Sequence, residues 1–132
     1  PPDGIDTVLC LEEPLHAYAP DGAVGGAPET WGPWVTYPDG SHTRAVIAAG
    51  LMAVGAPFEV VAESNQPDVL REMVRLGMGW AVLPEAQAGA GAEPLARVRR
   101  LPIGVRRLVV ARRSGASPDA AVDALAATLL DG

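Results

Sequence analysis

Hydrophobic and polar positions change period along the middle of the chain. Residues 34–37, 58–62 and 80–83 form short apolar runs bounded by glycine, proline or polar residues, which is typical of buried strands. Residues 41–55 and 64–77 instead carry apolar side chains three and four positions apart, the spacing of an amphipathic helix. The resulting order of strand, helix, strand, helix, strand favours a parallel sheet with right-handed crossovers.

The first predicted helix has a core face and recognisable ends. Ile47, Leu51 and Val54 follow one another at spacings of four and three, so they share the buried side. Ser41 is placed to cap the helix start, and Gly55 to supply the left-handed residue at which the helix stops.

The second predicted helix lies in "SNQPDVLREMVRLGMG". Asn65 is predicted to cap its start, and the Pro-Asp pair at residues 67–68 suits a first helical turn. The Leu-Gly pair at residues 76–77 is predicted to end it. The side chains expected on its buried side are Leu70, Met73, Val74 and Gly77.

The segments before and after this core are less regular. Residues 8–11 form a short apolar run that two glutamates and a proline interrupt, and residues 15–19 predict a strand with two unlike faces. Residues 20–33 are a loop by their glycine and proline content, and the Pro-Asp-Gly at residues 38–40 is a turn.

Beyond Pro84 the pattern allows one helical turn in residues 85–94 and strands at residues 97–101 and 107–111. A final helix is predicted to open at Ser117-Pro118-Asp119. Its narrow apolar stripe is Val122, Leu125 and Leu129.

Composition sets the broad class. The chain has 132 residues, 48% hydrophobic and 20% charged, which suits one folded domain. No apolar run approaches the roughly 20 residues that span a bilayer, and the first residues do not resemble a secretion signal. We therefore expect a soluble, cytoplasmic protein with no membrane partner. The net charge of −6 argues against a chain that binds nucleic acid by itself.

The basic residues are unevenly distributed. All ten are arginine, and seven of them fall within residues 97–113. We interpret the pairs at residues 99–100, 106–107 and 112–113 as solvated strand ends. A phosphate-binding stripe is the less favoured alternative, because aromatic stacking partners are absent there.

No set of residues indicates a reaction, a metal or a cofactor. Cys10 lies in an apolar run, where a buried inert thiol is expected, and His16 and His42 are too far apart in sequence to suggest a metal-ligand motif. Glu12 and Glu13 are adjacent, so on a strand they point to opposite faces. The glycine-rich residues 22–26 lack the spacing of a phosphate-binding loop. We expect no enzyme activity.

The polar residues gather instead where two predicted strands pass into helices. One junction holds Gly40, Ser41, His42 and Thr43, and the other holds Ser64, Asn65 and Gln66. Helix starts carry N–H groups without internal partners, and their dipole favours negative charge. Two such starts at one sheet edge predict a cradle for a small organic anion.

Simpler interpretations stand beside this one. Ser41 and Asn65, each taken alone, are more often caps, and His42 is more often an exposed first-turn residue. Trp80 is a candidate pocket wall, although a core position is the more usual role.

The order of these segments is similar to the effector-binding domain of LysR-type transcriptional regulators. The resemblance runs from "LEEPLHAYAP" through "GSHTR" to "EVVAESNQPDVLREMVRLGMGWAVLPE". Its strongest piece is "REMVRLGMGWAVLP", a helix, an apolar-Gly-x-Gly turn, a buried strand and a closing proline. The later "RRLVVARR" and "DAAVDALAATLL" fall where that family has its last strand and last helix.

The resemblance implies an α/β fold of the type 2 periplasmic-binding-protein class, mainly one lobe, with a metabolite bound in a cleft between two lobes. Residues 1–132 would be a partial effector-binding domain. Residues 14–112 would form lobe II with its hinge strands, at residues 15–19 and 107–111. Residues 1–13 and 113–132 would be remnants of lobe I or return to it.

The resemblance also implies partners. A small-molecule effector would bind at the two helix starts, and the protein would form a homodimer or homotetramer, with the helix at residues 44–54 as a contact face. DNA would be bound only through an N-terminal domain outside this chain. Trp80 stands where the family commonly has a smaller aliphatic residue. The alternatives are a solute-binding module of a transport system and an enzyme of similar fold whose acid and base lie on the other lobe.

Overall fold

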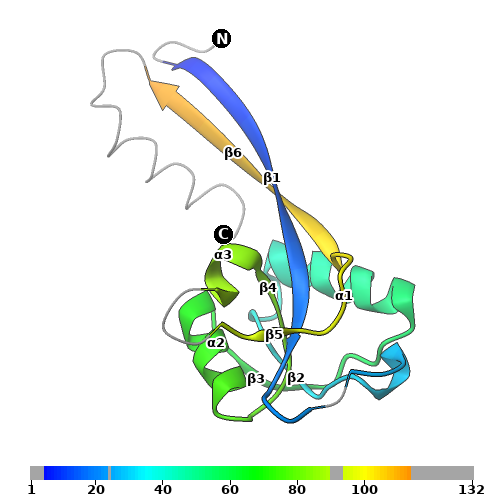
Figure 1. The fold of residues 1–132 in the computed structure, drawn as a ribbon. Coiled ribbons are helices and arrows are strands. Elements are labelled where there is room, and N and C mark those ends of the chain that lie inside the picture. The colour runs from blue at the N-terminus through cyan, green and yellow to red at the C-terminus, as the bar shows by residue number, and fades with distance from the viewer. Residues whose placement is uncertain (1–4, 24, 90–93, 114–132) are drawn as a thin grey trace.

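The fold was analysed in a computed structural model, which describes residues 5–23, 25–89 and 94–113 (Figure 1). In chain order the elements are β1 (Ile5–Ala19), a 3-10 turn (Pro28–Thr30), β2 (Trp34–Thr36), α1 (His42–Val54), β3 (Val60–Glu63), α2 (Pro67–Arg75), β4 (Ala81–Pro84), α3 (Glu85–Ala88), β5 (Ala96–Arg97) and β6 (Gly104–Arg113). The predicted order of strands and helices between residues 34 and 84 is confirmed.

The strands form two hydrogen-bonded sheets, one of β2 and β3 and one of β4, β1 and β5 with β6 also paired to β1, and an isolated bridge joins the two sheets. β2 pairs with β3 in parallel, and a parallel bridge joins Trp34 at the start of β2 to Trp80 just before β4. β1 pairs with the other edge of β4 in antiparallel register. The parallel arrangement predicted for the middle of the chain is therefore confirmed, and the handedness of its crossovers stays a prediction.

β1 and β6 form a long two-stranded ribbon that leaves the body of the molecule (Figure 1). The pairing runs from Ile5 opposite Arg113 to Leu15 opposite Gly104. The two predicted segments before the loop are thus one strand, with Pro14 inside it. Pairing with β4 begins only at Leu15, so at Pro14 one edge of β1 has no described strand beside it and can tolerate a missing N–H.

α1 packs closely on the chain that leads into β6. Ile47 and Leu51 are fully buried and Val54 is half-buried, so the predicted core face is confirmed. Gly50, on the same helix, lies so near Ile103 that a Cβ built there would come within 2.1 Å of the Ile103 carbonyl oxygen. The absence of a side chain at Gly50 is what lets helix and strand approach.

Both ends of α1 are as predicted. The Ser41 hydroxyl accepts a hydrogen bond from the Arg44 N–H at 3.3 Å, and Gly55 ends the helix with a φ of 83°. Such a glycine stop satisfies carbonyls of the last turn, here those of Leu51 and Met52.

The start of α2 differs from the prediction. The N-cap position is Gln66, and its side chain makes no capping hydrogen bond. Asn65 is exposed, and Ser64 is the residue whose hydroxyl accepts from the Gln66 N–H, at 3.1 Å. The cap prediction failed because Ser64 closes a local turn one residue earlier and Pro67 brings no N–H to be capped.

The buried side of α2 also needs one correction. Leu70 and Val74 are buried and Met73 is half-buried, as predicted, but Gly77 is exposed. Gly77 has a φ of 81° and lies just past the helix, where the chain turns toward β4.

Two predictions about the ribbon were wrong. Cys10 is exposed, because it lies in the part of β1 that has β6 as its only described strand partner and no described helix over it. Arg106 is buried rather than solvated. Its guanidinium binds the carboxylate of Glu13, the residue opposite it on β1, with Nε at 3.0 Å. Arg100 and Arg107 are exposed, as predicted.

The strand predicted at residues 97–101 is reduced to the two residues of β5. The chain after it follows β1 through single backbone hydrogen bonds, from Val98 N to Ala17 O and from Ile103 N to Leu15 O. The final helix predicted to open at residues 117–119 lies outside the described residues. Within the described residues, no helix has the length and apolar character needed to cross a membrane.

Candidate ligand-binding site

The two strand-to-helix junctions lie at the edge of the sheet that is formed by the carboxyl ends of the parallel strands. Thr36 and Glu63, the last residues of β2 and β3, are paired in register, and the Ser64 N–H donates to the Thr36 carbonyl at 3.0 Å. The chain passes from Thr36 toward α1 and from Glu63 toward α2. Adjacent parallel strands have therefore brought both helix starts to the same side, as predicted.

This edge is also the side from which the ribbon projects. Pro84, the last residue of the parallel strand β4, is opposite Leu15, and Leu15 is where β1 passes from the sheet into the ribbon. Anything that packs beside the ribbon would therefore lie over the carboxyl ends of the parallel strands.

A tight turn sets the entrance to α1. The Ser41 N–H donates to the Pro38 carbonyl at 3.1 Å, and Gly40 at the third position of the turn has a φ of 90°. A positive φ at that position is the type II arrangement, which glycine adopts without strain. The turn delivers Ser41 to the capping position and leaves Gly40 exposed beside it.

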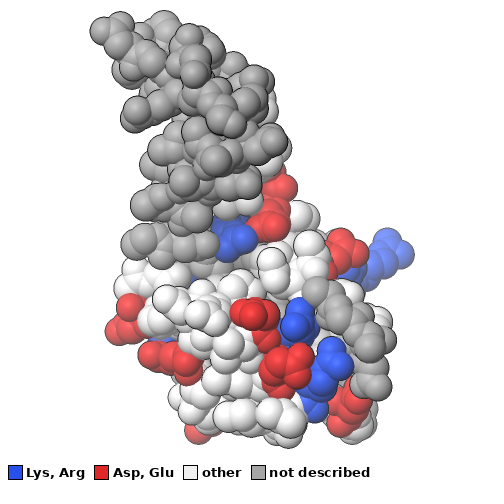
Figure 2. Space-filling model, turned by 90° about the vertical axis from the view of Figure 1, so that its left-hand side faces the viewer, with Lys and Arg blue, Asp and Glu red and all other residues white. Residues whose placement is uncertain are grey.

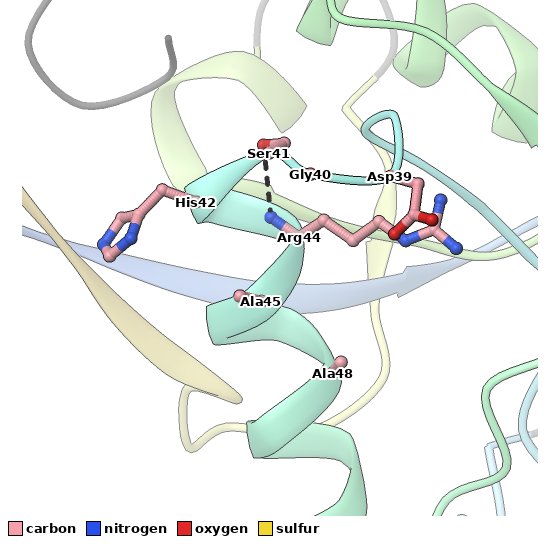
Figure 3. A pocket seen from close by; sticks show the side chains of 7 residues that line it. All are labelled: Asp39, Gly40, Ser41, His42, Arg44, Ala45 and Ala48. Carbon is pink, nitrogen blue, oxygen red and sulfur yellow. Dashed lines mark hydrogen bonds between the residues drawn. The ribbon is translucent and has the colours of Figure 1, made fainter.

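A hollow of about 510 Å³ opens at this entrance (Figure 3). Its lining residues are Asp39, Gly40, Ser41, His42, Arg44, Ala45 and Ala48. His42 and Arg44 point to opposite sides of the helix start. The polar groups that line the hollow are thus a hydroxyl, an imidazole, a guanidinium and one carboxylate. Ala45 and Ala48 line the rest of it.

The Arg44 side chain contacts residues of both junctions. Its Nη1 donates to the Tyr37 carbonyl at 3.1 Å and to the Glu63 carboxylate at 2.6 Å, and its guanidinium carbon lies 5.6 Å from the centre of the Phe58 ring. The side chain is 19% exposed. Sequence reasoning missed Arg44 as a site residue. Its only signal was its place four residues after Gly40 in "GSHTR".

The structure places only some of the predicted site residues at this hollow. Gly40, Ser41 and His42 line the hollow, and His42 is exposed. Thr43 is fully buried, so its side chain does not face solvent. Residues 64–66 lie at the neighbouring junction on the same edge and do not line this hollow.

Trp80 does not reach this edge. It precedes β4 and bridges to the first residue of β2, so it lies at the amino ends of the parallel strands. Its ring stacks on Trp31 at 6.3 Å between centroids and meets Trp34 edge-on at 6.0 Å. The core position, the alternative considered for Trp80, is the one observed.

Charge on the described surface is mixed. Acidic and basic side chains stand next to one another on the face shown in Figure 2. On α2, Glu72 forms ion pairs with both Arg71 and Arg75. Among the described residues, no group of three or more His, Cys, Asp or Glu side chains is placed to hold a metal ion. The chemistry that the edge supports is hydrogen bonding and charge pairing with a small polar molecule.

Comparisons with known proteins agree with this architecture. The chain matches the LysR substrate binding domain family over residues 1–132. The curated proteins contain no match to the sequence.

Solved structures of low sequence identity share the fold. The regulatory domain of CcmR from Synechocystis PCC6803, in complex with 2-PG, aligns with a TM-score of 0.64 and 20% identity over 94% of this chain and 65% of that one. A reduced form of OxyR from N. meningitidis aligns with a TM-score of 0.53 and 18% identity over 91% of this chain and 61% of that one. The chain therefore spans less than two thirds of these proteins. The match along its whole length shows that it belongs to the LysR substrate-binding domain family, with an α/β fold of the type 2 periplasmic-binding-protein class represented mainly by one lobe.

Proposed function

We propose that this chain is the sensory domain of a LysR-type transcriptional regulator in the cytoplasm. It binds a small anionic metabolite at the edge where β2 and β3 end, and it does so without converting that metabolite. Ligand binding changes the arrangement of the domain and, through it, of a DNA-binding domain elsewhere in the protein.

The observation that carries the proposal is the position of the two helix starts. β2 and β3 end side by side, at Thr36 and Glu63, so the starts of α1 and α2 lie at one edge of the sheet. The ribbon leaves from that same edge. Each helix start favours an anion by about 0.3–1 kcal/mol when exposed, and by more when partly buried. Hydrogen bonds from several groups are needed for useful affinity, and the site offers Ser41, His42 and Arg44 on one side and Asn65 and Gln66 on the other.

The comparison with CcmR supports a ligand-binding role. That regulatory domain is known in complex with the small molecule 2-PG, and its fold is shared by this chain. Family membership favours a regulator over a solute-binding module of a transport system.

The division of the chain follows the change in pairing along β1. Residues 14–112 would be lobe II with its hinge strands. The pairing supports the boundary near residue 14, because N-terminal to Leu15 the described part of β1 pairs with β6 and not with β4. Residues 1–13 and 113–132 would belong to the other lobe, and the cleft would lie over the edge described above. For the response to be allosteric, the ligand must bind the closed arrangement of the lobes better than the open one.

We further propose that the whole protein works as a homodimer or homotetramer in which α1 contributes to a contact. Its inward face is core, so the contact would use the outward face, where Ala45, Ala49 and Ala53 are exposed and Met52 is 80% exposed. Ala49→Arg should lower the mass measured by sedimentation equilibrium, and Leu76→Arg, at another exposed apolar site just past α2, should not. An unchanged mass in Ala49→Arg would exclude this face.

A thermal-shift panel tests the binding proposal. The full-length protein is heated with aromatic, dicarboxylic and amino acids, and one class should raise the unfolding temperature, since a ligand that binds only the folded state stabilises it. The variant Ser41→Gly, His42→Ala, Asn65→Ala, Gln66→Ala should lose that shift. Ser41→Gly keeps a tolerated N-cap and costs only a few tenths of a kcal/mol.

The matched control lies at the opposite edge of the sheet. Asp21 follows β1 and Glu59 precedes β3, so both lie away from the helix starts, and both are exposed. The double variant Asp21→Ala, Glu59→Ala should keep the full shift. Equal shifts in both variants would place the ligand elsewhere.

A further inference from the structure

α1 lies against the first residues of β6 through two glycines, one on each side of the contact (Figure 1). A Cβ at Gly50 would lie 2.1 Å from the Ile103 carbonyl oxygen, and a Cβ at Gly104 would lie 2.9 Å from Cγ1 of Val46. Val46 and Gly50 are four residues apart, so they share one side of α1. The two contacts leave no space in which α1 could move toward residues 103–104 without displacing them.

Residues 103–104 form the root of the ribbon, the point at which it leaves the body of the molecule. The Ile103 N–H donates to the Leu15 carbonyl at 2.7 Å, and Gly104 is opposite Leu15 in the pairing of β1 with β6. Leu15 is fully buried and is also opposite Pro84 of β4. The body therefore holds the ribbon at β1 through β4, whereas α1 contacts it at β6. A displacement that acts on one strand while the other is held rotates the ribbon against the body.

The two strands of the ribbon are joined just beyond the root. The Arg106 guanidinium binds the Glu13 carboxylate on the opposite strand, and Arg106 is buried. This ion pair adds to the backbone pairing, so the strands move together. At about 3.3 Å per residue, the ten residues of β6 extend roughly 30 Å, so a rotation of about 5° at the root moves the far end by roughly 3 Å. A small shift of α1 is therefore enlarged at the far end of the ribbon.

The start of the same helix carries the candidate site. Ser41, His42 and Arg44 line the hollow there, and Val46 follows Arg44 by two residues. We propose that α1 transmits ligand binding at its start to the ribbon, through its contacts with residues 103–104. The rotation of the ribbon is then the change of arrangement by which binding reaches the rest of the protein. This inference rests on the function proposed above and identifies the element that carries its response.

The first test measures the orientation of the ribbon without any ligand, so a failure to find an effector leaves its result unaffected. Residual dipolar couplings of the ¹⁵N-labelled full chain give the orientation of residues 8–13 and 105–110 relative to β2, β3 and β4. Gly104→Ala adds a Cβ against Val46, whose branched side chain has one strongly preferred rotamer in a helix. Gly104 has no positive φ, so its backbone accepts alanine. The ribbon should rotate in this variant.

The double variant Val46→Ala, Gly104→Ala shows whether that rotation arises from the contact with α1. It moves a methyl group from one side of the contact to the other and nearly conserves the packed volume, so the ribbon should return to the wild-type orientation. An unchanged orientation in Gly104→Ala, or a rotation that persists in the double variant, would overturn the proposal.

A second test starts from the site and adds no atoms to the packed contact. Arg44→Met removes the bonds of the first turn of α1 to the Tyr37 carbonyl and to Glu63, and it should shift the amide signals of residues 103–106. Arg71→Met, on α2, is the matched control, because the two arginine side chains are 19% and 16% exposed. It should leave those signals in place. Unmoved signals in Arg44→Met, or an equal shift in Arg71→Met, would contradict the proposal even if Gly104→Ala did not fold.

Discussion

Single side chains at the candidate site add to the backbone contacts between β2 and β3. Arg44, in the first turn of α1, binds Glu63 at the end of β3 and the Tyr37 carbonyl after β2. Arg44 therefore adds a side-chain contact between the two helix starts. A ligand that touches both junctions would depend on that contact.

Removing the charge of Glu63 should loosen this connection. Glu63 is 45% exposed, so solvent screens the pair, and we expect Glu63→Gln to lower the free energy of unfolding by about 1 kcal/mol or less. Urea unfolding measures the change. Glu59→Gln serves as the control, because Glu59 is exposed just before the same strand and has no ion pair among the described residues. A loss of the same size in both variants would mean that the Arg44 contact adds nothing.

His16 gives a pH dependence whose sign follows from its surroundings. Burial, and then the nearby charge of Arg97, lower the pKa of His16 below its ordinary value of 6.5, while Glu85 opposes them. The unfolded chain therefore binds more protons than the folded one just below pH 6.5, so stability is fully present above that pH and is lost as the pH falls toward the folded pKa.

His16→Gln should remove this part of the pH dependence. The slope that disappears is at most about 1.4 kcal/mol per pH unit, the limit for one proton. Stability measured from pH 7.5 to 5 for the wild type, His16→Gln and His42→Gln gives the comparison, since His42 is exposed. If the His42 variant changed the slope and the His16 variant did not, the assignment would be reversed.

Among the elements, α1 is the one whose sequence explains it most fully. The cap at Ser41, the core residues Ile47 and Leu51 and the stop at Gly55 were all predicted from local spacing, and all are observed. Gly50 is the exception. A glycine within a helix normally costs about 1 kcal/mol relative to alanine, and only the contact with Ile103 explains it.

Gly50→Ala should therefore destabilise the protein, against the trend of helix propensity. The added Cβ would lie 2.1 Å from the Ile103 carbonyl oxygen, which is backbone and cannot move aside alone. We expect a loss of about 1–3 kcal/mol in the free energy of unfolding, typical of overpacking. Ala49→Gly, at the exposed neighbouring position, should cost about 1 kcal/mol by propensity alone. A more stable Gly50→Ala protein would contradict the close packing of α1 on residue 103.

Most of the features that sequence reasoning missed depend on pairing between distant segments. Local pattern divided β1 in two at Pro14, because nothing near Pro14 reveals that β6 lies beside it some ninety residues later. The same pairing exposed Cys10 and buried Arg106, reversing both predictions. The start of α2 was missed for a local reason, since Ser64 competes with Asn65 for the same turn.

At the scale of the whole molecule, the candidate site follows from strand direction. Local pattern was enough to predict three parallel strands, and so to place the junctions at residues 40–43 and 64–66 on one edge. It could not place Trp80, because the end of the sheet at which a residue lies depends on where its strand begins, and Trp80 comes before β4 and not at its close. It also gave no sign that Arg44 would bridge the junctions, because that contact joins residues 44 and 63 across two strands.

Mapping ligand binding onto the two edges of the sheet tests this account most directly. The full-length protein, labelled with ¹⁵N, is titrated with the compound that stabilises it most in the thermal-shift panel. The amide signals of residues 40–43 and 64–66 should shift together with one dissociation constant, while those of Asp21 and Glu59 stay in place. Shifts confined to one junction, or concentrated at the edge of Asp21 and Glu59, would contradict a ligand held between the two helix starts.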